Sequence, residues 1–302
     1  MVGIDLGSNS LRAVRIDCKS LEILDAREWI VRTAEELEAT GSIGEAAQKR
    51  IIEALCELKE EWAGEAFHIV ATAAFRKAKN AKEVIEEIER RYGFEVAIIT
   101  SELESYYSAK GAEFGLRRLG QKVEKFLLVD IGGGSTEIIL KHRSELVAQS
   151  FPVGILTTIQ KYRTKEEILF GIKKRMQSIR EFCLDIFEVF GKPKLFLGTG
   201  GTPATVAALK VGLDYESYDP KKVDGVTIGL QDVEAAYKRL IMLPKEQRAK
   251  LVGTGREDAI IAGLVILEEL LKKCDYSQMM VMDESVREGV ALEFCEKKDK
   301  IV

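Results

Sequence analysis

Two short stretches of the sequence have the residue types of a phosphate-binding turn. The first runs from Asp5 to Arg12 and the second from Asp130 to Glu137. In each, an apolar strand-like run ends in an aspartate, and a turn rich in Gly and Ser precedes a second strand-like run. Such a turn can aim several backbone N–H groups at one anion, and glycine lets the anion approach closely. An isolated copy would equally fit an ordinary glycine hairpin turn, but two copies in equivalent frames favour phosphate binding. The expected contacts are Gly7, Ser8, Asn9, Ser10, Arg12, Gly132, Gly133, Gly134, Ser135 and Thr136.

The two copies differ at their last position, where Arg12 in the first corresponds to Glu137 in the second. Arginine suits pairing with phosphate oxygens, whereas a carboxylate would repel phosphate unless it holds a metal ion or the attacking water. We therefore predict Mg²⁺ as a cofactor, with Asp130, Asp5 and Glu137 as its residues. An exposed strand residue is the alternative interpretation of Glu137.

Two further segments contribute candidate phosphate contacts. Arg76 stands beside Lys77 and Lys79 in an acidic protein, so it is either a phosphate contact or part of a solvated basic turn. The run from Gly198 to Thr202 supplies Gly200 and Gly201, although it lacks the lysine of a P-loop and the third glycine of a dinucleotide-binding loop.

Alternating strand-like and helical patterns predict an α/β protein that positions these residues. Capping boxes at Asn80–Glu83 and Thr164–Glu167 predict two helix starts. The offset of 125 residues between Asp5 and Asp130 indicates duplicated lobes rather than a solenoid, with a boundary near Gly111 to Lys122. The expected strands cover 2–5, 11–16, 22–31, 67–71, 95–100, 125–130, 136–141, 194–197 and 278–282, and the expected later helices cover 165–187, 202–211, 230–241, 256–274 and 284–296.

Composition narrows the function classes. A formal net charge of −4 argues against non-specific nucleic-acid binding. The sequence has no uninterrupted run of about 18 apolar residues that would predict a membrane span, and its first residues do not have the pattern of a signal peptide. We therefore expect a cytoplasmic protein. The five scattered cysteines argue against both a zinc site and a disulfide framework.

The two loops resemble the signature loops of the exopolyphosphatase/guanosine pentaphosphate phosphohydrolase (Ppx/GppA) family, in its short two-domain form. The resemblance continues through Gly41–Ile43, Ala71–Arg76 with Asn80, Gly198–Thr202, Arg256–Asp258 and Arg287–Gly289. It implies the two-lobed actin-like, ribonuclease H-like ATPase fold shared with acetate and sugar kinases and chaperone ATPases, with a cleft between the lobes. The implied N-terminal lobe is residues 1–115 plus a C-terminal helix, 286–302, and the implied C-terminal lobe is residues 116–285.

The resemblance also implies a reaction: Mg²⁺-dependent removal of terminal orthophosphate from inorganic polyphosphate, from guanosine pentaphosphate, or from both, as in the stringent response. It assigns Glu104 as the general base. Spacing alone allows a second role, because Ser101 and Glu104 also form a capping box. The partners implied are polyphosphate or guanosine penta- and tetraphosphate, and a second copy in a homodimer, without nucleic acid or membrane.

Two departures from the family pattern keep other functions open. Ser101 and Leu103 stand where the family usually has Gly and Glu, so one expected carboxylate is missing. A polyphosphate- or alarmone-binding regulator with weak or no catalysis is therefore the main alternative, and a kinase of the same fold is the third. The Arg287–Glu288 neighbours are expected to form an ion pair, and His68 and His142 are expected to have no chemical role.

Overall fold

The computed structural model describes residues 1–299, which form two compact units. The first unit is Met1–Gly111 together with the segment that starts at Glu284, and the second is Ala112–Asp283. The division implied by the family resemblance has its boundaries at 115/116 and 285/286. Residues 300–302, which that division assigns to the first lobe, lie outside the described residues.

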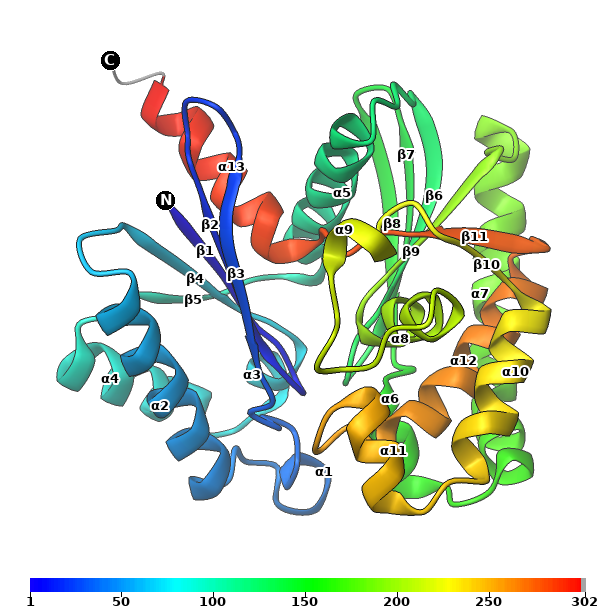
Figure 1. The fold of residues 1–302 in the computed structure, drawn as a ribbon, viewed down its shortest axis with the longest axis horizontal. Helices are drawn as coiled ribbons and strands as arrows, with labels where there is room; N and C mark the ends of the chain where they lie inside the picture. The colour runs from blue at the N-terminus through cyan, green and yellow to red at the C-terminus, as the bar shows by residue number, and fades with distance from the viewer. Residues whose placement is uncertain (300–302) are drawn as a thin grey trace. The chain divides into compact units, whose positions relative to one another are not determined.

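The first unit is built on a five-stranded sheet with strand order β3-β2-β1-β4-β5 (Figure 1). β1 pairs antiparallel with β2 and parallel with β4. The strands are β1 (Val2–Leu6), β2 (Leu11–Ile16), β3 (Ile23–Trp29), β4 (Phe67–Ala71) and β5 (Val96–Ile98). The helices are α1 (Leu37–Thr40), α2 (Glu45–Glu61), α3 (Ala73–Lys77), α4 (Ala81–Tyr92), the first part of α5 (Ser101–Arg118), and α13 (Val286–Asp299).

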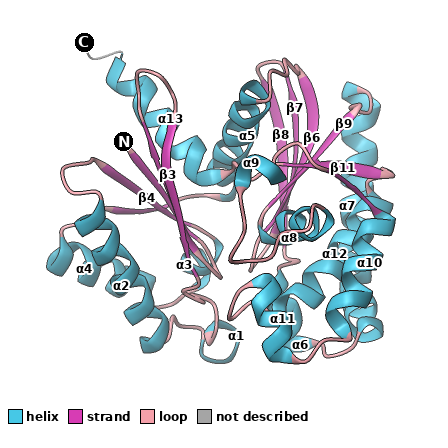
Figure 2. Ribbon diagram, viewed as in Figure 1, coloured by secondary structure: helices cyan, strands magenta, loops and turns pink. Residues whose placement is uncertain are grey.

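The central strand β1 is covered on both faces. Ile4 and Leu6 are fully buried and belong to the apolar core that contains residues of α2 and α4. Gly3 points to the opposite face, where a Cβ atom would lie 2.2 Å from the carbonyl oxygen of Arg287 in α13. Only glycine therefore allows α13 to pack this closely on β1. Figure 2 shows these three helices around the strands of the unit.

The second unit contains a six-stranded sheet with strand order β10-β11-β9-β6-β7-β8. Its long helices α7, α10 and α12 contribute to one apolar core with the strands. The strands are β6 (Lys125–Ile131), β7 (Thr136–His142), β8 (Glu145–Phe151), β9 (Leu195–Thr199), β10 (Thr227–Gly229) and β11 (Gln278–Val281). The helices are α6 (Ile155–Lys161), α7 (Lys165–Phe190), α8 (Gly201–Lys210), α9 (Pro220–Val223), α10 (Leu230–Ile241), α11 (Lys245–Val252) and α12 (Ala259–Lys273).

The two sheets share one strand order, which supports the duplication inferred from the sequence. In chain order within each unit, the third, second, first and fourth strands lie side by side as β3-β2-β1-β4 and as β8-β7-β6-β9. The next neighbour is parallel in both sheets: β5 beside β4, and β11 beside β9. The predicted α/β class is confirmed. In the second unit, strands β8 and β10 and helices α6, α9 and α11 are additions to the predicted elements.

One of the two predicted capping boxes is wrong. Thr164 and Glu167 form a capping box at the start of α7, as expected. Asn80 makes no side-chain cap of α4. Its amide instead pairs with the backbone of Ile43, accepting from N at 2.9 Å and donating to O at 3.0 Å. The side chain thus ties a distant loop to α4, a use that local spacing does not reveal.

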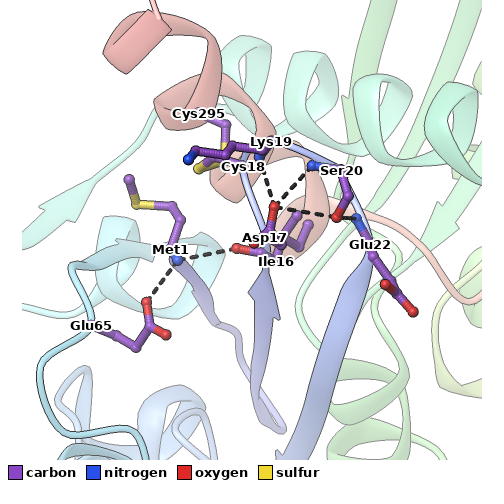
Figure 3. Close-up of a disulfide and its surroundings, with 9 residues drawn as sticks. All are labelled: Met1, Ile16, Asp17, Cys18, Lys19, Ser20, Glu22, Glu65 and Cys295. Atoms are coloured by element: carbon purple, nitrogen blue, oxygen red, sulfur yellow. Dashed lines mark hydrogen bonds and ion pairs between the residues drawn. A yellow bond between two sulfur atoms is a disulfide. The ribbon is translucent and has the colours of Figure 1, made fainter.

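The scattered cysteines argue against a disulfide framework, yet two of them are paired in the folded chain. Cys18, in the turn between β2 and β3, forms a disulfide with Cys295 of α13 (Figure 3). The turn is shaped by Asp17, whose carboxylate accepts from the backbone N atoms of Lys19 and Ser20 at 2.8 and 2.9 Å. The two cysteines are separated by 277 residues, so only the folded chain brings them together. Among residues 1–299, no helix is both long and apolar enough to cross a membrane.

Candidate active site

The two glycine turns have the same closed geometry. The N atom of Gly7 donates to the carbonyl of Ser10 at 3.0 Å, and that of Gly132 donates to the carbonyl of Ser135 at 2.9 Å. A Cβ atom would lie 3.1 Å from that carbonyl in either turn. Each turn therefore links two antiparallel strands through four residues, and glycine at its first position relieves a close contact.

The carbonyl groups of both turns are held by backbone from elsewhere in the same unit. In the first, Ser8 and Asn9 carbonyls accept from Ala34 and Arg32 at 2.9 and 2.8 Å. In the second, Gly132 and Gly133 carbonyls accept from Ile155 and Leu156, at the start of α6, at 3.0 and 2.8 Å. A trans peptide points its C=O and the next N–H in opposite directions. The N–H groups that follow are therefore turned away from these partners, as phosphate binding requires.

A row of polar residues crosses each sheet next to its turn. In the first unit, register places Glu28, Arg12 and Asp5 on neighbouring strands. In the second, it places Ser150, Glu137, Asp130 and Thr199 on β8, β7, β6 and β9. Residues in register share one face of a sheet. The predicted charged residues of each loop thus lie together, with Arg12 between two carboxylates.

Glu137 is almost completely buried rather than an exposed strand residue. Its side chain accepts from the hydroxyls of Ser135 and Ser150, both at 2.8 Å. The Thr136 hydroxyl donates to the carbonyl of Val153 at 2.5 Å, so this side chain is engaged within the second unit. Thr136 pairs with Ile131 of the apolar core, so strand alternation turns it to the face opposite Glu137.

Glu104 is held by Arg76 within the first unit. Nη1 of Arg76 lies 2.6 Å from Oε2 of Glu104 and 3.0 Å from the carbonyl of Ile99. Helix α5 begins at Ser101, and the hydroxyl of Thr100 accepts from the N atom of Leu103 at 3.3 Å. Thr100 therefore takes the cap position that the capping-box alternative gave to Ser101.

The neighbouring carboxyl of Glu102 is also stabilised in its charged form. Hydrogen bonds from the backbone N–H of Glu102 and from Thr100 lower the pKa of this carboxyl.

The glycine run after β9 forms the start of helix α8. Gly200, with φ of +95°, precedes the helix, and a Cβ atom there would lie 2.7 Å from the carbonyl of Ile131. A Cβ atom on Gly201 would lie 1.8 Å from Nη2 of Arg256. The guanidinium of Arg256 thus lies against the N-terminal end of a ten-residue helix, where the helix dipole also favours an anion. The sequence does not single out Arg256 as a site residue, because nothing in its spacing points to Gly201.

In each unit the candidate residues follow strands that end at the same edge of the sheet. β1, β4 and β5 are parallel, and they are followed by the first turn, by α3 with Arg76 and by the start of α5 with Glu104. β6 and β9 are parallel, and they are followed by the second turn and by Gly200. The carboxyl edge of parallel strands is the usual ligand-binding edge of α/β proteins.

The second unit supplies oxygen ligands of the kind that Mg²⁺ prefers. Within residues 1–299, no group of three or more His, Cys, Asp or Glu side chains could hold a metal. Mg²⁺ commonly binds through one or two carboxylates and keeps several waters, so the pair Asp130 and Glu137 fits it. Asp5 belongs to the first unit, whereas Asp130 and Glu137 belong to the second.

Comparison with known proteins agrees with these features. Residues 13–298 match the Ppx/GppA phosphatase family. The chain is 26% identical to exopolyphosphatase 2 of Mycobacterium tuberculosis, covering 97% of both chains. It is also 26% identical to a guanosine-5'-triphosphate,3'-diphosphate pyrophosphatase of Pseudoalteromonas translucida, covering 95% of this chain and 57% of that protein.

A solved structure extends the agreement to the fold. The crystal structure of the Aquifex aeolicus member of the Ppx/GppA family superposes with a TM-score of 0.74 at 29% identity, over 99% of this chain and 98% of that one. The match covers both units and both glycine turns. This chain belongs to the Ppx/GppA phosphatase family.

Proposed function

We propose that this protein hydrolyses the terminal phosphoanhydride bond of inorganic polyphosphate, of guanosine pentaphosphate, or of both, with Mg²⁺ as cofactor. One observation carries the proposal: the same closed glycine turn, beside a row of charged side chains, occurs once in each unit. The names of the relatives, an exopolyphosphatase and a guanosine pentaphosphate pyrophosphatase, support both substrates.

Each task of phosphoryl transfer has a candidate residue. The turns at Gly7–Ser10 and Gly132–Ser135 bind phosphate oxygens through backbone N–H groups. Asp130 and Glu137 would hold Mg²⁺ in the second unit, and Asp5 is the candidate metal residue of the first unit. When bound, Mg²⁺ neutralises charge on the phosphate oxygens. Arg256 and the start of α8 add positive potential beside the second turn.

Glu104 acts as the general base. Water attacks the terminal phosphorus, its proton passes to the Glu104 carboxylate, and the bond between that phosphorus and the bridging oxygen breaks to release orthophosphate. Arg76 fixes the orientation of the carboxylate through the 2.6 Å contact. Expected hydrolysis products are therefore orthophosphate and a chain shorter by one phosphate.

The test is phosphate release from polyphosphate, guanosine pentaphosphate and ATP in separate reactions, with Mg²⁺ and after chelation of Mg²⁺ by EDTA. Glu104→Gln and Glu137→Gln should each lower kcat by about 10²-fold or more on the true substrate, because each removes a group that the reaction needs. Glu113→Gln is the matched control, since Glu113 pairs with Arg117 on the exposed side of the same helix as Glu104. Wild-type rates in both site variants would refute the assigned roles.

A binding protein without efficient catalysis is the second candidate, and Leu103 favours it. This side chain is exposed at the start of α5, where the family resemblance leads us to expect a glutamate. Tight binding of either phosphate compound without release of orthophosphate would support this function. In that case Leu103→Glu should raise turnover if the missing carboxylate is the cause.

A further inference from the structure

Thr199 carries a buried hydroxyl that the fold does not use. The residue ends β9 and has no exposed surface. Within residues 1–299, its Oγ1 atom has no hydrogen-bond partner. Burying a hydroxyl without a partner costs free energy, so such groups are uncommon in native proteins. Because the Thr199 hydroxyl lies next to a candidate site, a bound ligand would supply the missing partner.

Strand register places this hydroxyl beside the candidate metal residues. Thr199 pairs with Asp130 across β9 and β6, and Asp130 pairs with Glu137 across β6 and β7. The three side chains share one face of the sheet. At the other end of the row, Glu137 accepts hydrogen bonds from the hydroxyls of Ser135 and Ser150. The Thr199 hydroxyl, in contrast, has no hydrogen bond to a protein group among residues 1–299.

The duplicated unit provides an internal comparison. Asp5 pairs with Val70 of β4, just as Asp130 pairs with Thr199 of β9, so Val70 is the counterpart of Thr199. Val70 is buried in an apolar cluster with Ile99 and Val286. Valine, which has nearly the shape of threonine, therefore satisfies this strand position in the first unit. The hydroxyl of Thr199 is an addition that strand packing does not require.

We propose that the Thr199 hydroxyl is an oxygen ligand of the Mg²⁺ held by Asp130 and Glu137. The inference rests on the metal site of the proposed function and adds a neutral ligand to two carboxylates. Hydroxyl oxygen suits this cation, as the Ser or Thr of P-loop proteins illustrates. The Mg²⁺ site of the second unit then consists of Asp130, Glu137 and Thr199, completed by water.

The experiment compares Thr199→Val with Thr199→Ser in two measurements. The first is thermal unfolding without metal, where we expect Thr199→Val to unfold at the wild-type temperature or above it, because it removes an unpaired buried hydroxyl. The second is binding of Mn²⁺, a hard cation with similar ligand preference, followed by electron paramagnetic resonance. We expect the valine variant to raise the Kd for Mn²⁺ by about 10-fold and the serine variant to stay close to wild type.

Asp130→Asn separates failure of this inference from failure of the metal site itself. If Asp130→Asn weakens Mn²⁺ binding and Thr199→Val does not, the role of Thr199 is overturned and the metal site stands. If neither variant weakens binding, both are overturned. A clear loss of metal-free stability in Thr199→Val would assign the hydroxyl a structural role and would also overturn the inference.

Discussion

The contact between Arg76 and Glu104 gives Arg76 a role other than phosphate binding. Sequence reasoning assigns Arg76 to phosphate, yet its guanidinium lies against a carboxylate and the carbonyl of Ile99. An arginine fixed in this way would position Glu104, the proposed general base. We therefore expect activity to depend on the orientation of the Glu104 carboxylate as well as on its presence.

Replacement of Arg76 distinguishes positioning from phosphate binding. Arg76→Met should lower kcat by about 10²-fold with little change in KM, because a misplaced catalytic group mainly costs transition-state stabilisation. Arg76→Lys should lose less, since it keeps the charge but not the planar donor. Steady-state kinetics of orthophosphate release provide the measurement. A rise in KM at unchanged kcat would instead identify Arg76 as a phosphate contact.

At the scale of elements, helix α13 is held in the first unit by side-chain contacts with strand β4 and helix α5. Phe294 stacks on His68 of β4 with ring centroids 3.4 Å apart. Lys110 of α5 contacts Glu293 and Glu296 at 2.7 and 2.8 Å. Within α13 itself, the ion pair expected between Arg287 and Glu288 is confirmed at 2.5 Å. Because α5 also carries Glu104, the docking of α13 supports the helix that carries the proposed general base.

The His68 contact makes this docking sensitive to pH. Burial, followed by the nearby N-terminal charge, lowers the pKa of His68 below its ordinary value of 6.5. The folded state therefore favours neutral His68, and its contribution is present above the unfolded pKa and lost as pH falls below it. The free energy of unfolding should decrease from pH 7 to pH 5, and His68→Leu should flatten that decrease.

Denaturant unfolding at a series of pH values measures this effect. His142→Leu, which removes the other histidine of the sequence, is the control. An equal pH dependence in wild type and His68→Leu would show that His68 does not contribute. Carboxylates titrate mainly at lower pH, so the comparison between variants isolates the histidine.

At the scale of the whole molecule, the disulfide joins two parts of the chain that lie far apart in the sequence. The first unit consists of two separate segments, and Cys18–Cys295 links one to the other. The residues between the two cysteines include the entire second unit. A cross-link of this kind restricts the unfolded chain over a long loop, which stabilises the folded state.

Reduction of the disulfide should lower the free energy of unfolding by roughly 2–5 kcal/mol. Cys18→Ser should have the same effect and should make the protein insensitive to reductant, whereas Cys56→Ser, at a free cysteine, should not. Calorimetry with and without dithiothreitol measures the difference. Thiol titration of the denatured protein should find three free thiols before reduction and five afterwards. Five thiols without reduction would contradict the pairing.

The sequence by itself determined the features that are local or repeated. Hydrophobic periodicity predicts most strands, because alternation is encoded within a few residues. The two Asp-to-Gly turns predict equivalent loops, and the structure gives both the same closing hydrogen bond. The spacing of the copies indicates the duplication that the common strand order displays.

Only the tertiary structure decided which distant residues meet. Arg76 reaches Glu104, Arg256 reaches Gly201, Asn80 reaches Ile43, and Cys18 reaches Cys295 through packing that no short-range pattern records. Strand register likewise decided that Thr199 lies beside Asp130, while Thr136 faces the core. A one-residue change of register would reverse those faces, so the chemistry of the row depends on pairing between strands far apart in the chain.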